Sequence, residues 1–231
     1  MTQRAVFMAD IHGNITGLRA VLQEVKKLEA VTHIVALGDF FGWSAGHNDL
    51  VELLLEHGVI LIRGGHEELL TLIDEGRDGG KYYPEIYMTH DWLKKHLHPD
   101  TYAMMASLPT VFRLKLNDRD SLIAFHAAFN DMESYTCGPD RSLDVLRATY
   151  GGLPENLVLY GHYHEPHVLP MDGKLLVNCA SVGARVRDSL SNYTVVEYDE
   201  EKFAIMQKQV PYDRKEEEEL IKARGVVRRN A

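Results

Sequence analysis

Seven side chains suited to metal or proton chemistry stand at intervals along the 231-residue chain: Asp10, His12, Asp39, His66, His126, His162 and His164. Each of them follows a short apolar run, at the place where a buried strand would end. Carboxylate oxygen and imidazole nitrogen together suit divalent Mn, Fe, Zn or Ni better than Ca or Mg. One carboxylate can bridge two ions that lie about 3.5–4 Å apart. The pattern therefore predicts a centre of two divalent metals, in which Asp39 is the bridging carboxylate.

Each of these residues has a simpler interpretation when it is considered alone. Asp10 precedes a helical pattern and would serve as the N-cap of that helix. A single histidine such as His126 is more often a packed, hydrogen-bonded residue, and the pair His162 and His164 would also fit a surface loop. Five separated segments nevertheless carry suitable residues in order, each at a predicted strand end. This joint pattern favours the metal centre.

The apolar spacing in the first part of the chain predicts strands that alternate with helices. Apolar runs at residues 4–9, 33–37 and 59–62 predict three strands, and helical spacing over 15–28 and 50–55 predicts the connecting helices. Such strand–helix–strand units favour parallel pairs with right-handed crossovers. Since ligands bind beyond the carboxyl ends of the strands in open α/β sheets, the candidate side chains should converge on one rim.

The rest of the chain predicts an insertion and then more strands. Residues 76–110 interrupt the alternation with two helical pieces, which we expect to pack over one end of the sheet as a cap-like insertion. The C-terminal part is rich in strands, which suggests a second sheet, and Glu216–Glu219 indicate a solvated helical face. The later elements are strands at 111–116, 121–125, 157–160, 174–177, 193–198 and 203–210, and a helix at 143–150.

The charge and composition of the chain argue against several classes of protein. The formal net charge of -9 argues against non-specific binding to nucleic acid, whose phosphates require a basic surface. The chain has no run of about 18 apolar residues and its first apolar stretch is too short for a secretory signal, so we expect no membrane span and a cytoplasmic location. Cys137 and Cys179 are expected to be two reduced thiols. We expect one domain over residues 1–231.

The joint motif resembles the calcineurin-like metallophosphoesterase superfamily over about Val6 to Gly183. The resemblance implies an α/β fold, a four-layer α/β/β/α sandwich of two mixed sheets, with the helical insertion over the active-site rim. The motif is highly specific for fold and metal chemistry and poorly specific for substrate. It consists of Asp10-x-His12, Gly38-Asp39, Gly64-x-His66-Glu67, His126 and Gly161-His162-x-His164.

The resemblance also implies a role for each motif residue. The first metal ion would be held by Asp10, His12, Asp39 and His164, and the second by Asp39, His126 and His162. A metal-bridging hydroxide would attack phosphorus in line, and manganese is the favoured metal. His66 would stabilise the transition state or protonate the leaving oxygen, with Glu67 or Asp39 orienting its ring.

One position departs from the family pattern. The family places an asparagine directly before the catalytic histidine, where its side-chain oxygen binds the second metal, and this chain has Gly65 there. Three protein ligands remain for the second metal. We therefore expect that site to be weakened and more hydrated.

The residues after Asp39 bear on the substrate. Phosphoprotein phosphatases of the superfamily continue this motif with Asp-Arg, whereas this chain has Phe40-Phe41-Gly42-Trp43. It looks more like the small bacterial phosphodiesterases and diadenosine-tetraphosphatase-like enzymes. The three aromatic residues either stack on a base or serve packing, and packing is the favoured interpretation.

These observations predict metal-dependent hydrolysis of a phosphate ester. The substrate would be a phosphodiester or phosphomonoester, either a small molecule or a nucleotide. Two alternatives stay open at this point. The first is a catalytically weakened, metal-binding scaffold for a partner protein, which Gly65 favours and the retained His66 disfavours. The second is a phosphoprotein phosphatase.

Overall fold

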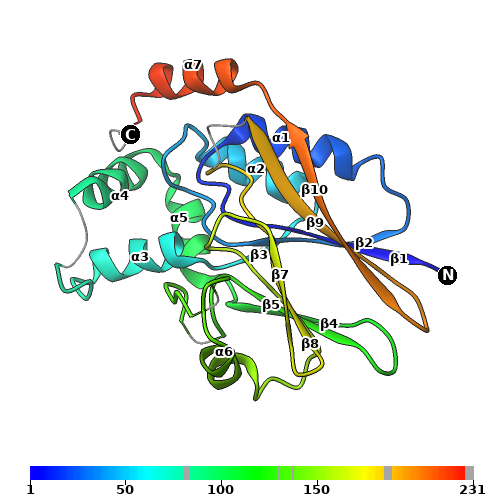
Figure 1. Ribbon diagram of the computed structural model, residues 1–231. Coiled ribbons are helices and arrows are strands. Elements are labelled where there is room, and N and C mark those ends of the chain that lie inside the picture. The colour runs from blue at the N-terminus through cyan, green and yellow to red at the C-terminus, as the bar shows by residue number, and fades with distance from the viewer. Residues whose placement is uncertain (81–83, 130, 137, 185–188, 227–231) are drawn as a thin grey trace.

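A computed structural model describes residues 1–80, 84–129, 131–136, 138–184 and 189–226 (Figure 1). Cys137 and part of the predicted insertion, residues 81–83, lie outside the described residues. The described residues form seven helices and two mixed sheets of five strands each. Cys179 is a free, buried thiol.

The first sheet has the strand order β10-β9-β1-β2-β3. Its parallel part is the predicted strand–helix–strand unit: β1, β2 and β3 run parallel, with α1 and α2 as the crossovers. These elements are β1 (Gln3–Met8), α1 (Ile15–Val25), β2 (Val31–Leu37), α2 (Asn48–Glu56) and β3 (Ile60–Ile62).

The second sheet has the strand order β4-β5-β6-β8-β7. Strands β5, β6 and β8 run parallel, while β4 and β7 lie antiparallel at the two edges. Helix α6 connects β5 to β6. The elements are β4 (Val111–Lys115), β5 (Ser121–Phe125), α6 (Leu143–Tyr150), β6 (Leu157–Tyr160), β7 (His167–Met171) and β8 (Lys174–Asn178).

The last two strands differ from the sequence-based expectation. The prediction that the C-terminal strand run belongs to a second sheet was wrong for β9 (Leu190–Tyr198) and β10 (Phe203–Pro211). Strand β9 pairs antiparallel with β1, and β10 pairs with β9, so both extend the first sheet. Alternation of apolar residues indicates which face of a strand is buried, but not which strand is its neighbour.

Three apolar layers hold the sandwich together. Phe7 of the first sheet and Leu122 and Leu157 of the second lie in a core between the two sheets. Leu18 of α1 packs on the outer face of the first sheet, and Tyr150 of α6 packs on the outer face of the second. Figure 1 shows α1 and α2 above the first sheet and α6 below the second. The predicted α/β/β/α arrangement of two mixed sheets is confirmed.

Three helices lie on the side of the molecule where β1 and β2 end (Figure 1): α3 (Gly65–Asp74), α4 (Pro84–His96) and α5 (Pro99–Ser107). Buried His90 of α4 lies 3.1 Å from Asp74, and the Tyr102 hydroxyl of α5 donates to the carbonyl of Leu70 at 3.1 Å. Helix α4 also borders a narrow gap that Trp43 and His66 line. The insertion helices are therefore fixed to α3, beside His66.

The C-terminal helix α7 (Arg214–Arg224) carries a buried carboxylate. Glu217 accepts hydrogen bonds from the backbone N–H of Thr16 at 3.0 Å and from the Thr16 hydroxyl at 2.8 Å. It also accepts from the Ser44 hydroxyl. The prediction of a solvated face over Glu216–Glu219 was therefore wrong for Glu217, which ties α7 to the loops beneath it. Within the part of the chain described above, no helix is long and apolar enough to cross a membrane.

Candidate metal centre

The seven candidate side chains lie at the carboxyl ends of five parallel strands from both sheets. Asp10 and His12 follow β1, Asp39 follows β2, and His66 is the second residue of α3, just beyond β3. His126 follows β5, and His162 and His164 follow β6. Because the two sheets face each other, both sets of strand ends open onto one rim.

Asp10, His12 and His164 form a first cluster, whose ligand atoms all lie within 4.8 Å of one another. The Nε2 atoms of His12 and His164 are 3.0 Å apart, and His164 Nε2 lies 3.4 Å from Asp10 Oδ1. Asp10 is not the N-cap of α1, because Asn14 accepts the hydrogen bond at that helix start. Its second oxygen instead accepts from the backbone N–H of His162 at 2.8 Å.

Asp39, His126 and His162 form a second cluster of the same size. His126 Nε2 lies 3.4 Å from Asp39 Oδ2. The same oxygen lies 3.9 Å from Nε2 of His12, a member of the first cluster. Asp39 therefore stands between the two clusters, in the position that a shared carboxylate requires.

The backbone holds five of the six candidate ligands in an uncommon conformation. Asp10, His12, Asp39, His162 and His164 have φ angles between 48° and 67°. This left-handed region costs about 1–2 kcal/mol for a residue with a side chain. Such conformations are concentrated at functional sites, where the surrounding fold enforces them.

Two histidines are oriented by main-chain carbonyl groups. The Nδ1 atom of His126 lies 2.7 Å from the carbonyl oxygen of Leu37, and that of His12 lies 3.3 Å from the carbonyl oxygen of Phe41. A carbonyl can only accept, so each Nδ1 carries the proton. Each Nε2 then faces the cluster, where it can bind metal once it carries no proton, as in histidines that ligate metals.

The donor set fits divalent cations. Asp10 Oδ1, His126 Nε2 and His162 Nε2 are buried and have no hydrogen-bond partner among the described residues. Burying polar atoms without a partner is costly, and metal coordination would satisfy all three. Carboxylate and imidazole ligands of this kind suit Mn, Fe, Zn or Ni.

The buried charges at the centre shift the pKa values of its side chains. Burial would raise the pKa of Asp39, but nearby His126 and His66 lower it well below its usual value. Burial would lower the pKa of His126, but the negative charge of Asp39 raises it to about 10. The pKa of His12 is lowered to about 3 by burial and by neighbouring His164 and His66. Asp39 is therefore an ionised, buried carboxylate, and protonated His126 supplies the positive charge beside it when no metal is bound.

His66 lies at the rim of the centre. Its backbone N–H donates to Asp39 Oδ1 at 2.8 Å, and its Nε2 lies 3.9 Å from Asp39 Oδ2. The ring is part of a third group with Asp39 and His12. Its side chain is 20% exposed, so it faces both the cluster and solvent.

Glu67 supports the backbone rather than the His66 ring. It is buried, and it accepts from the backbone N–H of Asp39 at 2.8 Å and of Phe40 at 2.9 Å. It also accepts from the N–H of Gly64 at 3.0 Å. Of the two residues expected to orient the His66 ring, Glu67 therefore does not do so, while Asp39 Oδ2 lies 3.9 Å from His66 Nε2. Burial and the charge of Asp39 raise the pKa of Glu67 to about 7.

Gly161 and Gly64 allow the strand ends to approach each other closely, whereas Gly65 is not required for this close approach. A Cβ atom on Gly161 would lie 2.6 Å from Asp10 Oδ2, and one on Gly64 would lie 2.4 Å from the Asp39 nitrogen. Neither position has room for a side chain. A Cβ atom on Gly65 would lie 3.2 Å from the Met132 carbonyl oxygen, so a small adjustment would make room for one.

Aromatic residues flank the centre. Phe40 and Phe41 are fully buried, which confirms the packing interpretation for both. Trp43 stacks on the His12 ring with centroids 4.2 Å apart. Tyr135 lies 4.5 Å from the His162 ring. The sequence analysis missed Tyr135, because neither a motif nor a spacing links it to the metal ligands.

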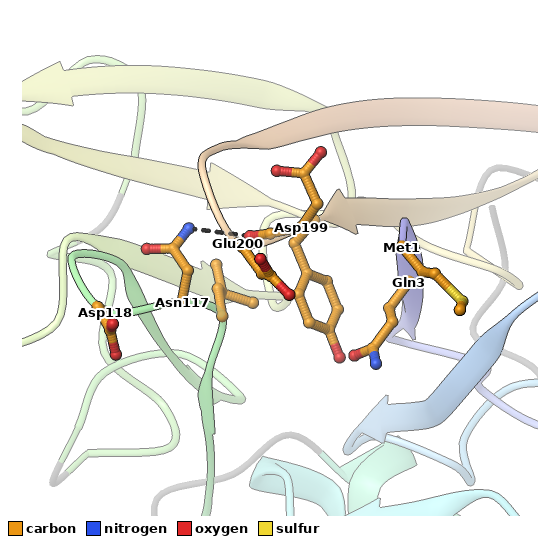
Figure 2. Close-up of a pocket in the computed structure, with 8 residues that line it drawn as sticks. Met1, Gln3, Asn117, Asp118, Asp199 and Glu200 are labelled. Atoms are coloured by element: carbon orange, nitrogen blue, oxygen red, sulfur yellow. Dashed lines mark hydrogen bonds between the residues drawn. The ribbon is translucent and has the colours of Figure 1, made fainter.

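A separate hollow of about 360 Å³ lies at the opposite end of β1 (Figure 2). Its side chains include the carboxylates of Asp118, Asp199 and Glu200, and Figure 2 shows them with Met1 and Gln3. Asp118 forms an ion pair with Lys115, whose Nζ lies 2.8 Å from Asp118 Oδ1. Among the described residues, the groups with metal-ligand geometry lie at the other end of the strand.

The family model for the calcineurin-like phosphoesterase superfamily domain matches residues 4–201, which include every candidate ligand. The chain belongs to this superfamily. It is therefore a phosphoesterase of the hydrolase class, and the family together with the buried Asp/His clusters indicates that it binds divalent metal.

Individual proteins resemble this chain in sequence or in fold. An uncharacterized protein of Methanocaldococcus jannaschii is 30% identical over 94% of this chain and 91% of its own length. The structure of a hypothetical protein from Pyrococcus horikoshii superposes with a TM-score of 0.83 at 18% identity, covering 97% of this chain and 94% of that one. A metallophosphoesterase from Sphaerobacter thermophilus superposes with a TM-score of 0.71 at 19% identity, covering 97% and 95%.

Proposed function

We propose that this protein hydrolyses a phosphodiester or phosphomonoester by means of two divalent metal ions, with manganese favoured. The observation that carries the proposal is the position of Asp39. One oxygen of this carboxylate lies 3.4 Å from His126 Nε2 and 3.9 Å from His12 Nε2, so it is within reach of both clusters. Asp10, His12, Asp39 and His164 would hold the first ion, and Asp39, His126 and His162 the second.

The metals, when bound, would polarise the phosphoryl oxygens and activate the attacking water. The side chains of the protein would supply a proton and hold the shared carboxylate in position. His66 Nε2 lies at the rim and would donate a proton to the leaving oxygen. The hydrogen bond from the His66 N–H to Asp39 Oδ1 would hold helix α3 against the shared carboxylate. Glu67 would fix the Asp39 backbone from behind.

The proposed substrate is a small phosphorylated molecule or nucleotide. The centre is a rim that the insertion helices and Trp43 border, which favours a compact substrate. The net charge of -9 disfavours non-specific binding to nucleic acid. We keep a cytoplasmic location as part of the proposal, with no membrane partner.

The test is activity of the metal-stripped protein as Mn²⁺ is added back. The substrates are bis-p-nitrophenyl phosphate and p-nitrophenyl phosphate, and His66→Ala is the matched variant. We expect metal-dependent turnover that falls sharply in the variant, and the preferred substrate separates a diesterase from a monoesterase. A protein that binds Mn²⁺ but turns over neither ester at saturating metal would contradict the proposal and favour the scaffold.

A further inference from the structure

Tyr135 is an exposed aromatic residue at the metal centre. The residue is 61% exposed. Its ring centroid lies 4.5 Å from that of His162, at an interplanar angle of 57°. His162 belongs to the second cluster, so the Tyr135 ring stands directly beside the second candidate metal site.

The backbone of Tyr135 is held firmly in spite of the exposed ring. Its carbonyl oxygen accepts from Arg141 Nε at 2.9 Å and from the Tyr163 hydroxyl. The preceding residue, Ser134, is buried, and its hydroxyl lies 2.8 Å from that of Thr136. The ring is therefore kept at the rim by contacts of its backbone and neighbours, while most of its own surface faces solvent.

The aromatic residue on the other side of the centre differs in this respect. Trp43 is half-buried, stacks on His12 with an interplanar angle of 28°, and lines the gap toward α4 together with Leu93. One face of its ring is covered by His12. Tyr135, by contrast, is exposed, so within the described part of the chain its ring is an aromatic surface at this rim that a bound molecule can reach.

We propose that Tyr135 is a stacking platform for the nucleobase of a nucleotide substrate whose phosphate lies at the metal centre. The inference rests on the proposed function and names the substrate class of the same site. Stacking of a base on an aromatic side chain contributes about 1–3 kcal/mol, whichever base is present. Tyr135 would therefore favour nucleotides over sugar or alkyl phosphates without selecting one base.

The test compares two ligands that differ only in the base: adenosine monophosphate and ribose 5-phosphate. Their dissociation constants are measured by calorimetry on Mn²⁺-loaded protein in a His66→Ala background, in which turnover of the bound ester is slowed by at least about 10²-fold. We expect the nucleotide to bind about 5- to 150-fold more tightly, the equivalent of one stacked base. Tyr135→Ala should reduce this ratio to near one, and Tyr135→Phe should preserve it.

A matched control is Leu55→Ala, which removes the apolar side chain of a residue that is 51% exposed on helix α2, a crossover of the first sheet. It should leave the ratio unchanged. Equal binding of the two ligands, no binding of the nucleotide, or an unchanged ratio in Tyr135→Ala would overturn the inference. Hydrolysis of bis-p-nitrophenyl phosphate is measured separately on protein with His66 intact, so failure of the proposed function and failure of the stacking inference give different results.

Discussion

The two metal-ligand clusters share Asp39, and each has two buried ligands and one partly exposed ligand, but they differ in the number of proposed ligands and in the residues that flank them. In the first, Asp10 and His12 are buried and the Trp43 ring stacks on His12. The second has three side-chain ligands, with the small residue Gly65 beside it and the exposed ring of Tyr135 over His162. Closed sites bind metal firmly, whereas catalytic sites keep an open position for water or substrate. The difference suggests a firmly held first ion and a second ion that meets the substrate.

The largest effect should come from the residue that both clusters share. Asp39→Asn should reduce kcat by at least about 10⁴, because it removes a charge contact at each of the two sites and the loss of one such contact costs about 10²–10³. His162→Ala changes the second cluster alone and should cost about 10²-fold. Asp118→Asn, at an acidic side chain that is 97% exposed at the far end, is the control. Equal losses in Asp39→Asn and His162→Ala would mean that Asp39 is not shared.

His66→Ala should separate proton transfer from metal binding. We expect a loss of about 10²-fold on p-nitrophenyl esters, since a positioned general acid contributes about 10²–10⁴. The loss should be larger on alkyl esters, whose leaving oxygen needs the proton more. Metal content, measured by atomic emission, should stay unchanged. A lower metal content in His66→Ala would indicate that His66 is itself a metal ligand, which would contradict the assignment of ligands to the two clusters.

The clusters should also differ in how pH affects metal binding. A histidine must lose its ring proton to bind metal. The Asp39 charge outweighs burial and raises the pKa of His126 to about 10, while the pKa of His12 is lowered to about 3 by burial and by His164 and His66. Affinity at the second site should therefore rise about tenfold per pH unit below the His126 pKa.

The pKa of His164 is also raised, because the Asp10 charge outweighs burial, so the first site keeps a weaker dependence of the same sign. Mn²⁺ calorimetry in buffers with different ionisation enthalpies measures the protons released at each site. Metal affinity that is flat with pH at both sites would contradict this part of the account.

The smallest effect expected is at Gly65. Gly65→Asn should tighten the second metal about tenfold by supplying an oxygen ligand, within the range seen when groups around a metal are changed. A side chain fits there after a small shift of the Met132 carbonyl. Gly152→Asn, where a Cβ atom meets nothing within 4 Å, is the matched control. Unchanged second-site affinity and stoichiometry in Gly65→Asn would disprove the weakened site.

Much of the fold and the ligand positions could be predicted from local pattern. The apolar runs before Asp10, Asp39 and His126 are buried strands. The rule that parallel strands end at one rim predicted that the side chains would lie close together, as they do. The two sheets required the resemblance, because alternation does not name a partner strand. For the same reason β9 was placed in the wrong sheet.

Other features depend on contacts between distant residues. From the sequence, Glu217 is expected to be one of four solvent-exposed glutamates. In the structure, the loop at Ser44 and the start of α1 surround it. Glu67 follows His66 in sequence, yet its carboxylate points to the backbone at Asp39. Tyr135 reaches His162 through a loop whose course no periodicity describes. Such tertiary contacts follow from packing, which a single sequence does not encode locally.

The central claim is that one carboxylate joins two metal sites, and electron paramagnetic resonance of the Mn²⁺-loaded protein tests it most directly. We predict two Mn²⁺ ions per chain with a spin-coupled signal, because ions that share a carboxylate lie about 3.5–4 Å apart. The Asp39→Asn variant should lose the coupling. Binding of a single ion, or of two ions with only uncoupled signals, would contradict the account.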